Sequence, residues 1–239
     1  MSRRFFCQRV SAASAVLEGS EAHHLAHVIR ANVGDRVTLF DGSGQEYAAT
    51  VREVGKSRVV LDLEPGCLVS RELPFRLVLG VALPKGERQK WLVEKAVELG
   101  VSRLVPLKTE RGVADPSSAL ARLRRGVIEA SKQCGRNRLM EVAEVESVSQ
   151  FFGAAPQEAV RLIAQPGTGG VSSDVTGAAN AFATTDRYVA IGPEGGFSDA
   201  ELAAATAVGW QPISLGPRVL RVETAALAVG AFLGLGVDR

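Results

Sequence analysis

The chain has 239 residues, which corresponds to one or two domains at about 150 residues per domain. Hydrophobic residues make up 46% of the sequence and charged residues 23%, so a folded globular protein is expected and disorder over the whole length is not. The formal net charge is only +2, so affinity for nucleic acid has to be judged from local clusters of basic residues.

The cysteines and the apolar segments indicate a cytoplasmic protein. Cys7, Cys67 and Cys134 form no C-x-x-C pair, and their odd number argues against a disulfide framework or a zinc ribbon. Arg9 interrupts the N-terminal segment before an apolar run develops, so we expect no signal peptide. The apolar stretch 224–237 is too short for a membrane-spanning helix of about 20 residues, and we expect a buried helix there.

The first 70 residues are expected to form a small β-rich domain, with a barrel as one option. Asp41-Gly-Ser-Gly44 lies between two predicted strands and is typical of a hairpin turn. Ser20 is a suitable N-cap, and the helical spacing that includes Leu25 predicts one helix running up to Gly34. The predicted strands span residues 36–40, 46–51 and 58–63.

After a linker at residues 65–74, strand and helix patterns alternate, so a second domain is expected over 75–239. The apolar run 76–83 is typical of a strand buried on both faces. Such alternation predicts an α/β fold with a mostly parallel sheet covered by helices on both faces. Further strands are predicted over 101–107, 160–164, 188–191 and 212–215, and helices over 91–99 and from 117 or 118 to about 134.

Three loops rich in glycine and proline follow predicted strands of this domain, at residues 165–170, 192–197 and 216–224. Ligands of parallel sheets bind outside the carboxyl ends of the strands, and glycine lets the backbone approach a ligand closely. Ser198 and Glu201 form a capping box, which predicts a helix after the second loop. Any one loop is equally well explained as a tight turn, but three on one sheet edge favour a binding site.

Known nucleotide-binding and catalytic motifs are missing from these loops. The dinucleotide motif G-x-G-x-x-G and the phosphate-binding loop are absent, which leaves a nucleoside ligand held by main-chain groups as an option. All three histidines, His23, His24 and His27, lie in the other domain, so no Ser-His-Asp set is predicted. His23 and His27 share a helix face, but no second pair of ligands is apparent and no metal site is expected.

Basic residues gather in two places. Arg3, Arg4 and Arg9 precede any acidic residue, and residues 111–140 contain seven basic and two acidic side chains. A solvated helix face is the ordinary explanation of such a run, but one cluster in each domain favours a polyanion lying across both. Phe5 and Phe6 beside the arginines could stack on bases, although core packing is expected for at least one of them.

Two long motifs in the C-terminal half identify a family. Ile191-Gly-Pro-Glu-Gly-Gly-Phe197 and Leu215-Gly-Pro-Arg-Val-Leu-Arg-Val-Glu-Thr-Ala225 resemble those of the RsmE family of ribosomal RNA uridine N3-methyltransferases, in the SPOUT or trefoil-knot superfamily. The resemblance covers nearly the whole chain, with Val219 and Val222 as small departures from the usual isoleucine and threonine. Further matching segments are 3–6, 23–25, 28–30, 34–35, 41–42, 95–100, 106–111 and 129–136.

The resemblance implies an N-terminal PUA-like RNA-binding barrel over 1–70 and a SPOUT methyltransferase domain over 75–239 with a deep trefoil knot, which elementary rules of chain topology would not predict. It also implies S-adenosylmethionine as cofactor, S-adenosylhomocysteine as product, and a homodimer. The target would be N3 of one uridine in 16S rRNA, methylated in the assembled small ribosomal subunit, with no metal and no membrane involved.

Site residues transfer from the family by position. Arg221 is expected to stabilise the uridine anion, and Glu194 to orient it, accept its proton or hold a loop through backbone N–H groups. The RNA-binding candidates are Arg3, Arg4, Arg9, Arg30, Arg111, Arg136 and Arg138. The expected cofactor-binding residues are Gln165, Pro166, Gly167, Ile191, Gly192, Glu194, Gly195, Gly196, Leu215, Gly216, Arg218, Val219, Leu220, Thr224 and Ala225.

Two alternatives remain open at this point. One is a non-catalytic RNA-binding or ribosome-assembly protein that retains the fold, although such a protein would have no need for the glycine loops. The other is a SPOUT methyltransferase that modifies another RNA base or a ribose hydroxyl.

Overall fold

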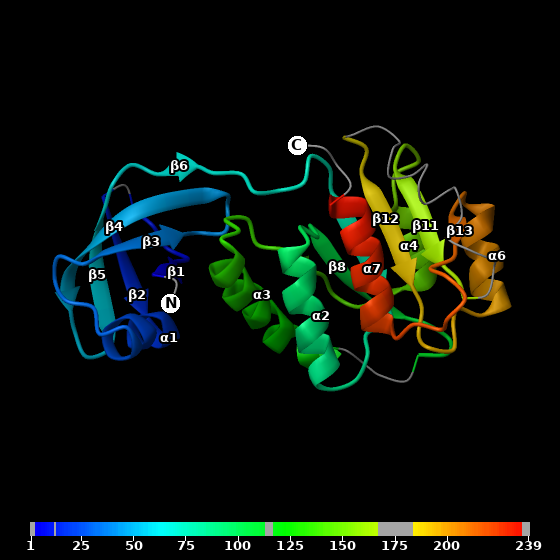
Figure 1. Cartoon of the computed structure of the whole chain (residues 1–239), viewed down its shortest axis with the longest axis horizontal. Helices are drawn as coiled ribbons and strands as arrows, with labels where there is room; N and C mark the ends of the chain where they lie inside the picture. Colours follow the sequence, from blue (N-terminus) through cyan, green and yellow to red (C-terminus); the bar gives the residue numbers. More distant parts are fainter. Residues whose placement is uncertain (1–2, 12, 113–116, 167–183, 236–239) are drawn as a thin grey trace. The chain divides into compact units, whose positions relative to one another are not determined.

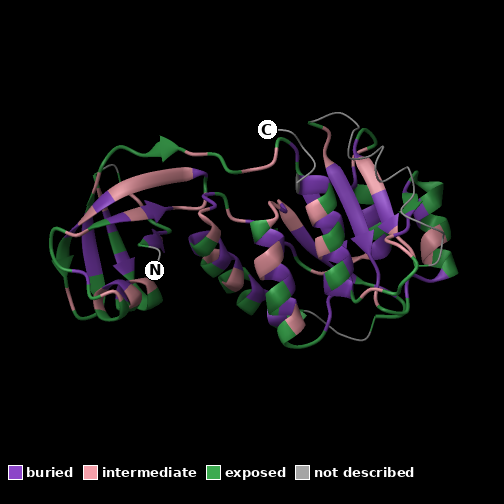
Figure 2. Cartoon of the chain, viewed as in Figure 1, coloured by how far each residue is buried: buried purple, intermediate pink, exposed green. Residues whose placement is uncertain are grey.

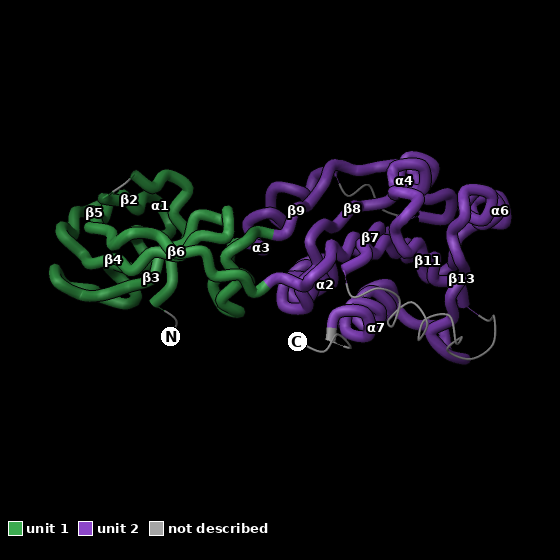
Figure 3. The backbone as a smooth tube through the Cα atoms, turned by 90° about the horizontal axis from the view of Figure 1, so that it is seen from above, with its two compact units in different colours: residues 1–71, 128–139 green, residues 72–127, 140–239 purple. Residues whose placement is uncertain are grey.

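The computed structural model describes residues 3–11, 13–112, 117–166 and 184–235 of the chain (Figure 1). These residues form two compact units, coloured separately in Figure 3. The N-terminal unit contains residues 1–71 together with 128–139, and the C-terminal unit contains residues 72–127 and 140–239.

The N-terminal unit is built on a six-stranded sheet in the order β1-β3-β4-β5-β2, with β6 paired to β4. β1 runs parallel to β3 and the other pairs are antiparallel. The predicted hairpin turn is confirmed, because Asp41 Oδ1 accepts the backbone N–H of Ser43 at 2.9 Å between β3 and β4. The strands are β1 (Arg4–Phe6), β2 (Ser14–Glu18), β3 (Arg36–Phe40), β4 (Gln45–Val54), β5 (Arg58–Leu63) and β6 (Cys67–Leu68).

The single helix predicted from Ser20 to Gly34 is replaced by a shorter segment that is partly α-helical and partly π-helical. α1 (Gly19–His23) begins after Glu18, whose side chain makes no capping bond, and a π-helical turn, η1 (His24–Val28), follows. The backbone N–H of Ile29 donates to the His24 carbonyl, five residues back, and Arg30 adopts a left-handed φ of 58°. The helix therefore ends well before Gly34, which apolar spacing alone does not reveal.

Residues 128–139 belong to the N-terminal unit, although the sequence analysis assigned the whole of 75–239 to the second domain. The segment contains the C-terminal half of α3 (Leu120–Cys134), which the 3₁₀ turn η2 (Ser117–Ala119) precedes. Lys132 Nζ lies 2.7 Å from Glu21 Oε1 on α1, and both side chains are largely buried. Long-range contacts of this kind leave no trace in local sequence patterns.

The C-terminal unit contains a seven-stranded, wholly parallel sheet in the order β10-β8-β7-β12-β11-β13, with β9 paired to β8. Every predicted strand of this unit is present, with ends shifted by one or two residues. The strands are β7 (Leu77–Val81), β8 (Arg103–Lys108), β9 (Glu141–Val142), β10 (Glu146–Ser147), β11 (Val160–Ala164), β12 (Arg187–Ile191) and β13 (Gln211–Ile213).

Helices cover both faces of this sheet, which confirms the predicted α/β class. In Figures 1 and 3, α2 (Glu87–Glu98) and α7 (Val222–Leu235) lie side by side on one face, with α4 (Val148–Ala154) and α6 (Asp199–Ala207) on the other. The central strands are buried along their length (Figure 2). The predicted capping box of Ser198 and Glu201 starts α6. The predicted apolar C-terminal helix is α7, whose Leu233 is fully buried.

The connections of the two central strands, β7 and β12, take opposite directions. The chain leaves β7 through α2 toward β8, whereas it leaves β12 through α6 toward β13 on the other side. Such a point of divergence is where open α/β sheets form ligand crevices. The path that would define the predicted trefoil knot includes residues 167–183, which lie outside the described residues.

Candidate active site

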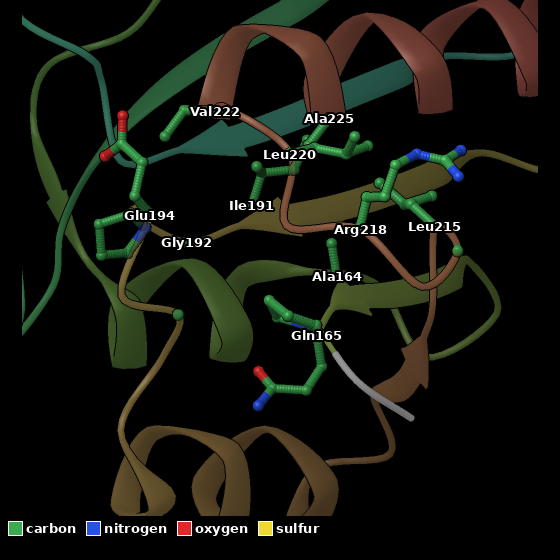
Figure 4. Close-up of a pocket in the computed structure, with 14 residues that line it drawn as sticks. Ala164, Gln165, Ile191, Gly192, Glu194, Leu215, Arg218, Leu220, Val222 and Ala225 are labelled. Atoms are coloured by element: carbon green, nitrogen blue, oxygen red, sulfur yellow. The ribbon is translucent and has the colours of Figure 1, made fainter. Parts of the chain in front are cut away.

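A pocket lies at the carboxyl edge of the C-terminal sheet, where β12, β11 and β13 are neighbours (Figure 4). Register pairs Ala164 with Ile191 and with Ile213, so the loops that follow these three strands leave the edge side by side. These loops and the start of α7 border a space of about 470 Å³ that is partly open to solvent. The lining residues are Ala164, Gln165, Pro166, Ile191, Gly192, Pro193, Glu194, Gly196, Leu215, Gly216, Arg218, Leu220, Val222 and Ala225.

Two glycines of the β12 loop are required by its shape. A Cβ atom on Gly192 would lie 3.1 Å from ring carbons of Phe197, which is itself only 1% exposed. Gly196 has a φ of +70° and its N–H donates to the Pro193 carbonyl at 2.8 Å, closing a tight turn. The motif therefore shapes a backbone wall on this side of the pocket.

The pocket is mostly apolar, with its polar groups at the ends. Figure 4 shows Ile191 and Leu220 between Glu194 on one side and Arg218 on the other. Gln165 extends from the end of β11, and its side-chain Oε1 is buried without a hydrogen-bond partner among the described residues. An acceptor held in this way costs free energy unless a ligand donates to it, so Gln165 is suited to bind a donor group.

Glu194 is tied to the start of α2. Its carboxylate accepts a hydrogen bond from Arg88 Nη1 at 3.1 Å, and the same Nη1 lies 3.6 Å from the buried Glu223 carboxylate. The backbone N–H of Glu194 donates to its own carboxylate, and this bond together with Arg88 and the charge of Arg221 lowers the pKa of the carboxyl. Glu194 is thus held ionised and is a weak proton acceptor.

Arg111, an RNA-binding candidate in the sequence analysis, supports the β12 loop. Its Nη1 donates to the carbonyl of Gly195 at 2.8 Å and to that of Phe197 at 3.3 Å. The neighbouring backbone N–H of Glu110 donates to Glu201 Oε1 at 2.8 Å, so the segment after β8 is attached at two points. Both contacts give Arg111 a structural role in holding the pocket wall.

Most of the expected cofactor residues line this one pocket. Of the others, Gly195, Val219 and Thr224 do not line it, and Val219 is 68% exposed. Gly167 lies outside the described residues. Sequence reasoning missed Ala164, Pro193 and Val222, which belong to the strand end, the glycine-rich motif and the first turn of α7. Because these residues lie in or next to the predicted loops in the sequence, they could have been included in the predicted site.

Arg221 lies in the segment between β13 and α7, at the turn that precedes the helix. Its side chain is exposed, and it is near enough to Glu194 for its positive charge to contribute to the lowered pKa of that carboxyl. The position is suitable for a cation beside the pocket.

Arg4 is not available as the RNA contact that the sequence analysis expected. It is only 8% exposed, and its guanidinium donates to Glu46 at 2.8 Å and to Asn137. Partial burial raises the pKa of the Glu46 carboxyl, but the hydrogen bonds from Arg4 and Asn137 lower it below its usual value. The structure therefore assigns Arg4 to the packing of the N-terminal unit. Arg136 is also buried, at 3% exposure.

Other RNA-binding candidates of the N-terminal unit are on its surface. Arg3, Arg9, Arg30 and Arg138 are exposed, and Arg138 donates to the carbonyl of Ser43 at 3.3 Å. Phe5 is fully buried in the core, as expected for at least one of the two phenylalanines.

The described residues contain no cluster of three or more histidine, cysteine, aspartate or glutamate side chains that could hold a metal. The rings of His23 and His27 have centroids 4.9 Å apart and are tilted by 47°. No helix among the residues described here is long and apolar enough to cross a membrane.

Comparison with known proteins shows what the chain is similar to. A family model described as an RNA methyltransferase domain matches residues 71–234, and one described as an RNA methyltransferase PUA domain matches residues 17–64. The chain is 33% identical over 223 residues to the ribosomal RNA small subunit methyltransferase E of Synechocystis sp., with 91% of this chain and 72% of that protein covered.

Two solved structures resemble the whole chain. A ribosomal RNA small subunit methyltransferase E from Neisseria gonorrhoeae, bound to S-adenosyl methionine, matches with a TM-score of 0.86 and 29% identity, covering 97% of this chain and 96% of that one. A methyltransferase from Legionella pneumophila in complex with the bound cofactor SAM matches with a TM-score of 0.85 and 34% identity, covering 98% and 97%.

Proposed function

Because these matches show that the chain belongs to the ribosomal RNA small subunit methyltransferase E (RsmE) family, we propose that it transfers a methyl group from S-adenosylmethionine to N3 of a uridine in 16S rRNA. The observation that supports this most directly is the pocket at the β12-β11-β13 edge, where the matched motifs meet. Relatives of the same family hold S-adenosylmethionine in their structures.

The residues of the pocket fit S-adenosylmethionine. The buried, unpartnered Oε1 of Gln165 can accept a hydrogen bond from the ligand, and the glycine wall leaves main-chain groups accessible. Ile191 and Leu220 provide apolar surface on which an adenine ring can pack. When bound there, the cofactor supplies a methyl group already activated on a sulfonium.

The remaining chemistry falls to the protein. Uridine N3 carries a proton and becomes nucleophilic only when it loses that proton, so a nearby cation that stabilises the anion accelerates the reaction. We assign this task to Arg221. The lowered pKa of Glu194 favours an orienting role, in which the carboxylate holds Arg88 and the β12 loop, over a role as proton acceptor.

The N-terminal unit is proposed to hold the RNA. Its match to an RNA methyltransferase PUA domain and its exposed Arg3, Arg9, Arg30 and Arg138 support contacts with phosphates. We further propose that the protein works as a cytoplasmic homodimer and that its substrate is the small ribosomal subunit.

Mass spectrometry of nucleosides from 16S rRNA, in cells with and without the gene, tests the proposal. We expect N3-methyluridine at one site in wild-type cells and its loss in the deletion strain, with restoration by the intact gene. Loss of a different modified base, or of a ribose methylation, would instead identify another methyltransferase of this fold. Calorimetry with S-adenosylhomocysteine distinguishes a methyltransferase of either specificity from a non-catalytic RNA-binding protein, because the latter is expected not to bind this compound.

A further inference from the structure

A second pocket, of about 480 Å³, opens at the same sheet edge on the other side of the β12 loop. It shares Pro193 and Glu194 with the cofactor pocket, so the two spaces are neighbours. The rest of its lining is residues 82–85 and Arg88 after β7, and Leu107 and Gly112 on or after β8.

The order of the strands explains why the pocket is there. β7 lies between β8 and β12, and Val81 at its end is in register with both Pro106 and Ile191. The Ala82 N–H still donates to the Ile191 carbonyl at 2.9 Å. Beyond this bond, the segment after β7 and the segment after β12 separate toward opposite sides of the sheet. The second pocket occupies that point of divergence, which is the place where sheets of this type bind ligands.

The charges in this pocket are unevenly matched. Arg88 is held by two carboxylates, with its Nη1 3.1 Å from Glu194 and 3.6 Å from Glu223. Lys85, by contrast, forms no ion pair with any residue that the structure describes, and its side chain is exposed at the pocket wall. Lys85 therefore presents an ammonium group that can donate to an electron-rich atom of a ligand.

We propose that this second pocket is the acceptor pocket, in which the target uracil binds, and that Lys85 donates to a carbonyl oxygen of its imide while Arg88 positions the shared Glu194 wall. The inference rests on the proposed methyl transfer. Reacting atoms must approach to about 3–3.5 Å in line, so the acceptor has to bind in direct continuation of the donor pocket. The second pocket adjoins the donor pocket at Pro193 and Glu194, which makes it a suitable place for the acceptor.

The reaction then balances without a further reactant. The N3–H bond breaks and the proton passes to water, leaving a negative charge shared by N3 and the two flanking carbonyl oxygens. The N3 electron pair forms the bond to the methyl carbon, and the electron pair of the carbon–sulfur bond stays on sulfur. Lys85, together with Arg221 as proposed above, would stabilise the charge that N3 and its carbonyls share before transfer.

The experiment compares Lys85→Ala, Lys85→Arg and the wild type, with Lys90→Ala as a matched control from an exposed position on the neighbouring helix turn. Small ribosomal subunits from cells lacking the gene are the substrate. Three quantities are measured for the full-length protein: the dissociation constant for S-adenosylhomocysteine, the dissociation constant for the subunits, and the single-turnover rate of methylation.

For Lys85→Ala we expect both dissociation constants within about threefold of wild type and a methylation rate lowered about 100-fold, the usual effect of removing one charge-stabilising donor. Lys85→Arg keeps the positive charge and should recover most of the rate, whereas Lys90→Ala should change nothing. A rate for Lys85→Ala within threefold of wild type overturns the inference, and so does equal impairment of the alanine and arginine variants. Absence of methylation by the wild type would instead refute the proposed function itself.

A separate variant tests the position of Arg88. Arg88→Lys retains a cation near Glu194 and should keep the rate of methylation within tenfold of wild type, while Arg88→Ala should lower the rate with little change in subunit binding. If Arg88→Ala leaves the rate unchanged, the positioning role is refuted, and if subunit binding falls together with the rate, Arg88 contacts RNA instead.

Discussion

The two pockets at the carboxyl edge of the C-terminal sheet share Pro193 and Glu194 but are built from different kinds of residue. The cofactor pocket is lined mainly by glycine backbone and apolar side chains, with the amide of Gln165 as its buried polar group and Glu194 and Arg218 at its ends. The acceptor pocket has apolar residues at 82–84 and Leu107, and adds two cationic side chains, Lys85 and Arg88, from the segment after β7. One sheet edge thus supports two forms of recognition within a few residues of each other.

The difference follows from the chemistry of the two proposed ligands. The methyl donor brings its own positive charge and needs to be held in one shape, which a rigid backbone wall does well. The acceptor has to develop negative charge, which an apolar wall would oppose and fixed cations favour. The division predicts that substitutions on the acceptor side change the rate, whereas substitutions on the donor side change affinity for the cofactor.

The largest expected effect comes from Arg221. Arg221→Ala removes the cation placed near Glu194, and we expect turnover to fall about 1,000-fold with the affinity for S-adenosylhomocysteine within about threefold of wild type. Steady-state methylation of small subunits and calorimetry provide the two readouts. Arg221→Lys should recover part of the turnover. A large loss of cofactor affinity would show that Arg221 contacts the cofactor. That result would contradict the assignment of rate effects to the acceptor side and affinity effects to the donor side.

The shape of the donor wall is tested at Gly192. The Cβ of Gly192→Ala would lie 3.1 Å from the packed ring of Phe197, so the loop has to move and cofactor affinity should fall about tenfold, or about 1.4 kcal/mol. Gly153→Ala is the control, because a Cβ there meets nothing within 4 Å. Calorimetry with S-adenosylhomocysteine decides, and equal affinities for the two variants would show that the wall is not rigid.

Arg111 distinguishes support of the loop from contact with RNA. Arg111→Ala removes the donors to the Gly195 and Phe197 carbonyls. Well-formed hydrogen bonds from charged groups contribute roughly 1.5–3 kcal/mol. Because Arg111 is exposed, we expect a smaller effect, a fall in cofactor affinity of about fivefold or about 1 kcal/mol. Binding to small subunits should keep its salt dependence. Arg125→Ala, at an exposed position in the same basic run, is the control. If the salt dependence of subunit binding becomes flatter in Arg111→Ala but not in Arg125→Ala, Arg111 contacts RNA after all.

The smallest effect concerns pH and Glu194. Its pKa in the folded protein lies below the usual 4.5, so the ion pair with Arg88 stabilises the fold above pH 4.5 and is lost as the pH falls through the lowered value. Exposed pairs contribute roughly 0–1 kcal/mol, and the Glu194 side chain is 45% exposed. Chemical denaturation of wild type and Glu194→Gln should therefore show a gap in unfolding free energy at pH 6 that closes toward pH 3.

Glu110→Gln serves as the control for this measurement, since the Glu110 carboxylate forms no ion pair with any residue in the described part of the chain. If its unfolding free energy changes with pH in the same way as that of Glu194→Gln, the effect does not arise from the pair with Arg88.

The regular parts of the fold were predictable because their physical causes are local. The buried parallel strand β7 is a continuous apolar run, and so is β12 after Arg187. Gly100 and Ser198 mark helix ends through their own backbone and side-chain preferences. The π-helical turn at His24–Val28 was missed because apolar spacing does not distinguish bonds to the fourth residue from bonds to the fifth. The packing of residues 128–139 on the N-terminal unit depends on contacts distant in sequence.

The two pockets also differed in how far they could be predicted from local sequence. The glycine and proline residues of the 192–197 motif indicate an unusual backbone conformation. The cofactor side of the pocket wall was therefore predictable from spacing and resemblance. Lys85 and Arg88 belong to no motif and meet Glu194 only because β7 and β12 are neighbours in the sheet. Arg4 was misassigned for a related reason, since a sequence shows its charge but not the Glu46 carboxylate that neutralises it.

The opposite courses of the chain after β7 and after β12 have a consequence for laboratory evolution of this protein. Residues 82–85 can be varied without altering the 192–197 loop in sequence, although both segments border the same wall. A library restricted to those four positions should explore new nucleobase or heterocycle acceptors while each member still delivers the same alkyl group. Selections that randomise both segments together would lose most members to failure of donor binding.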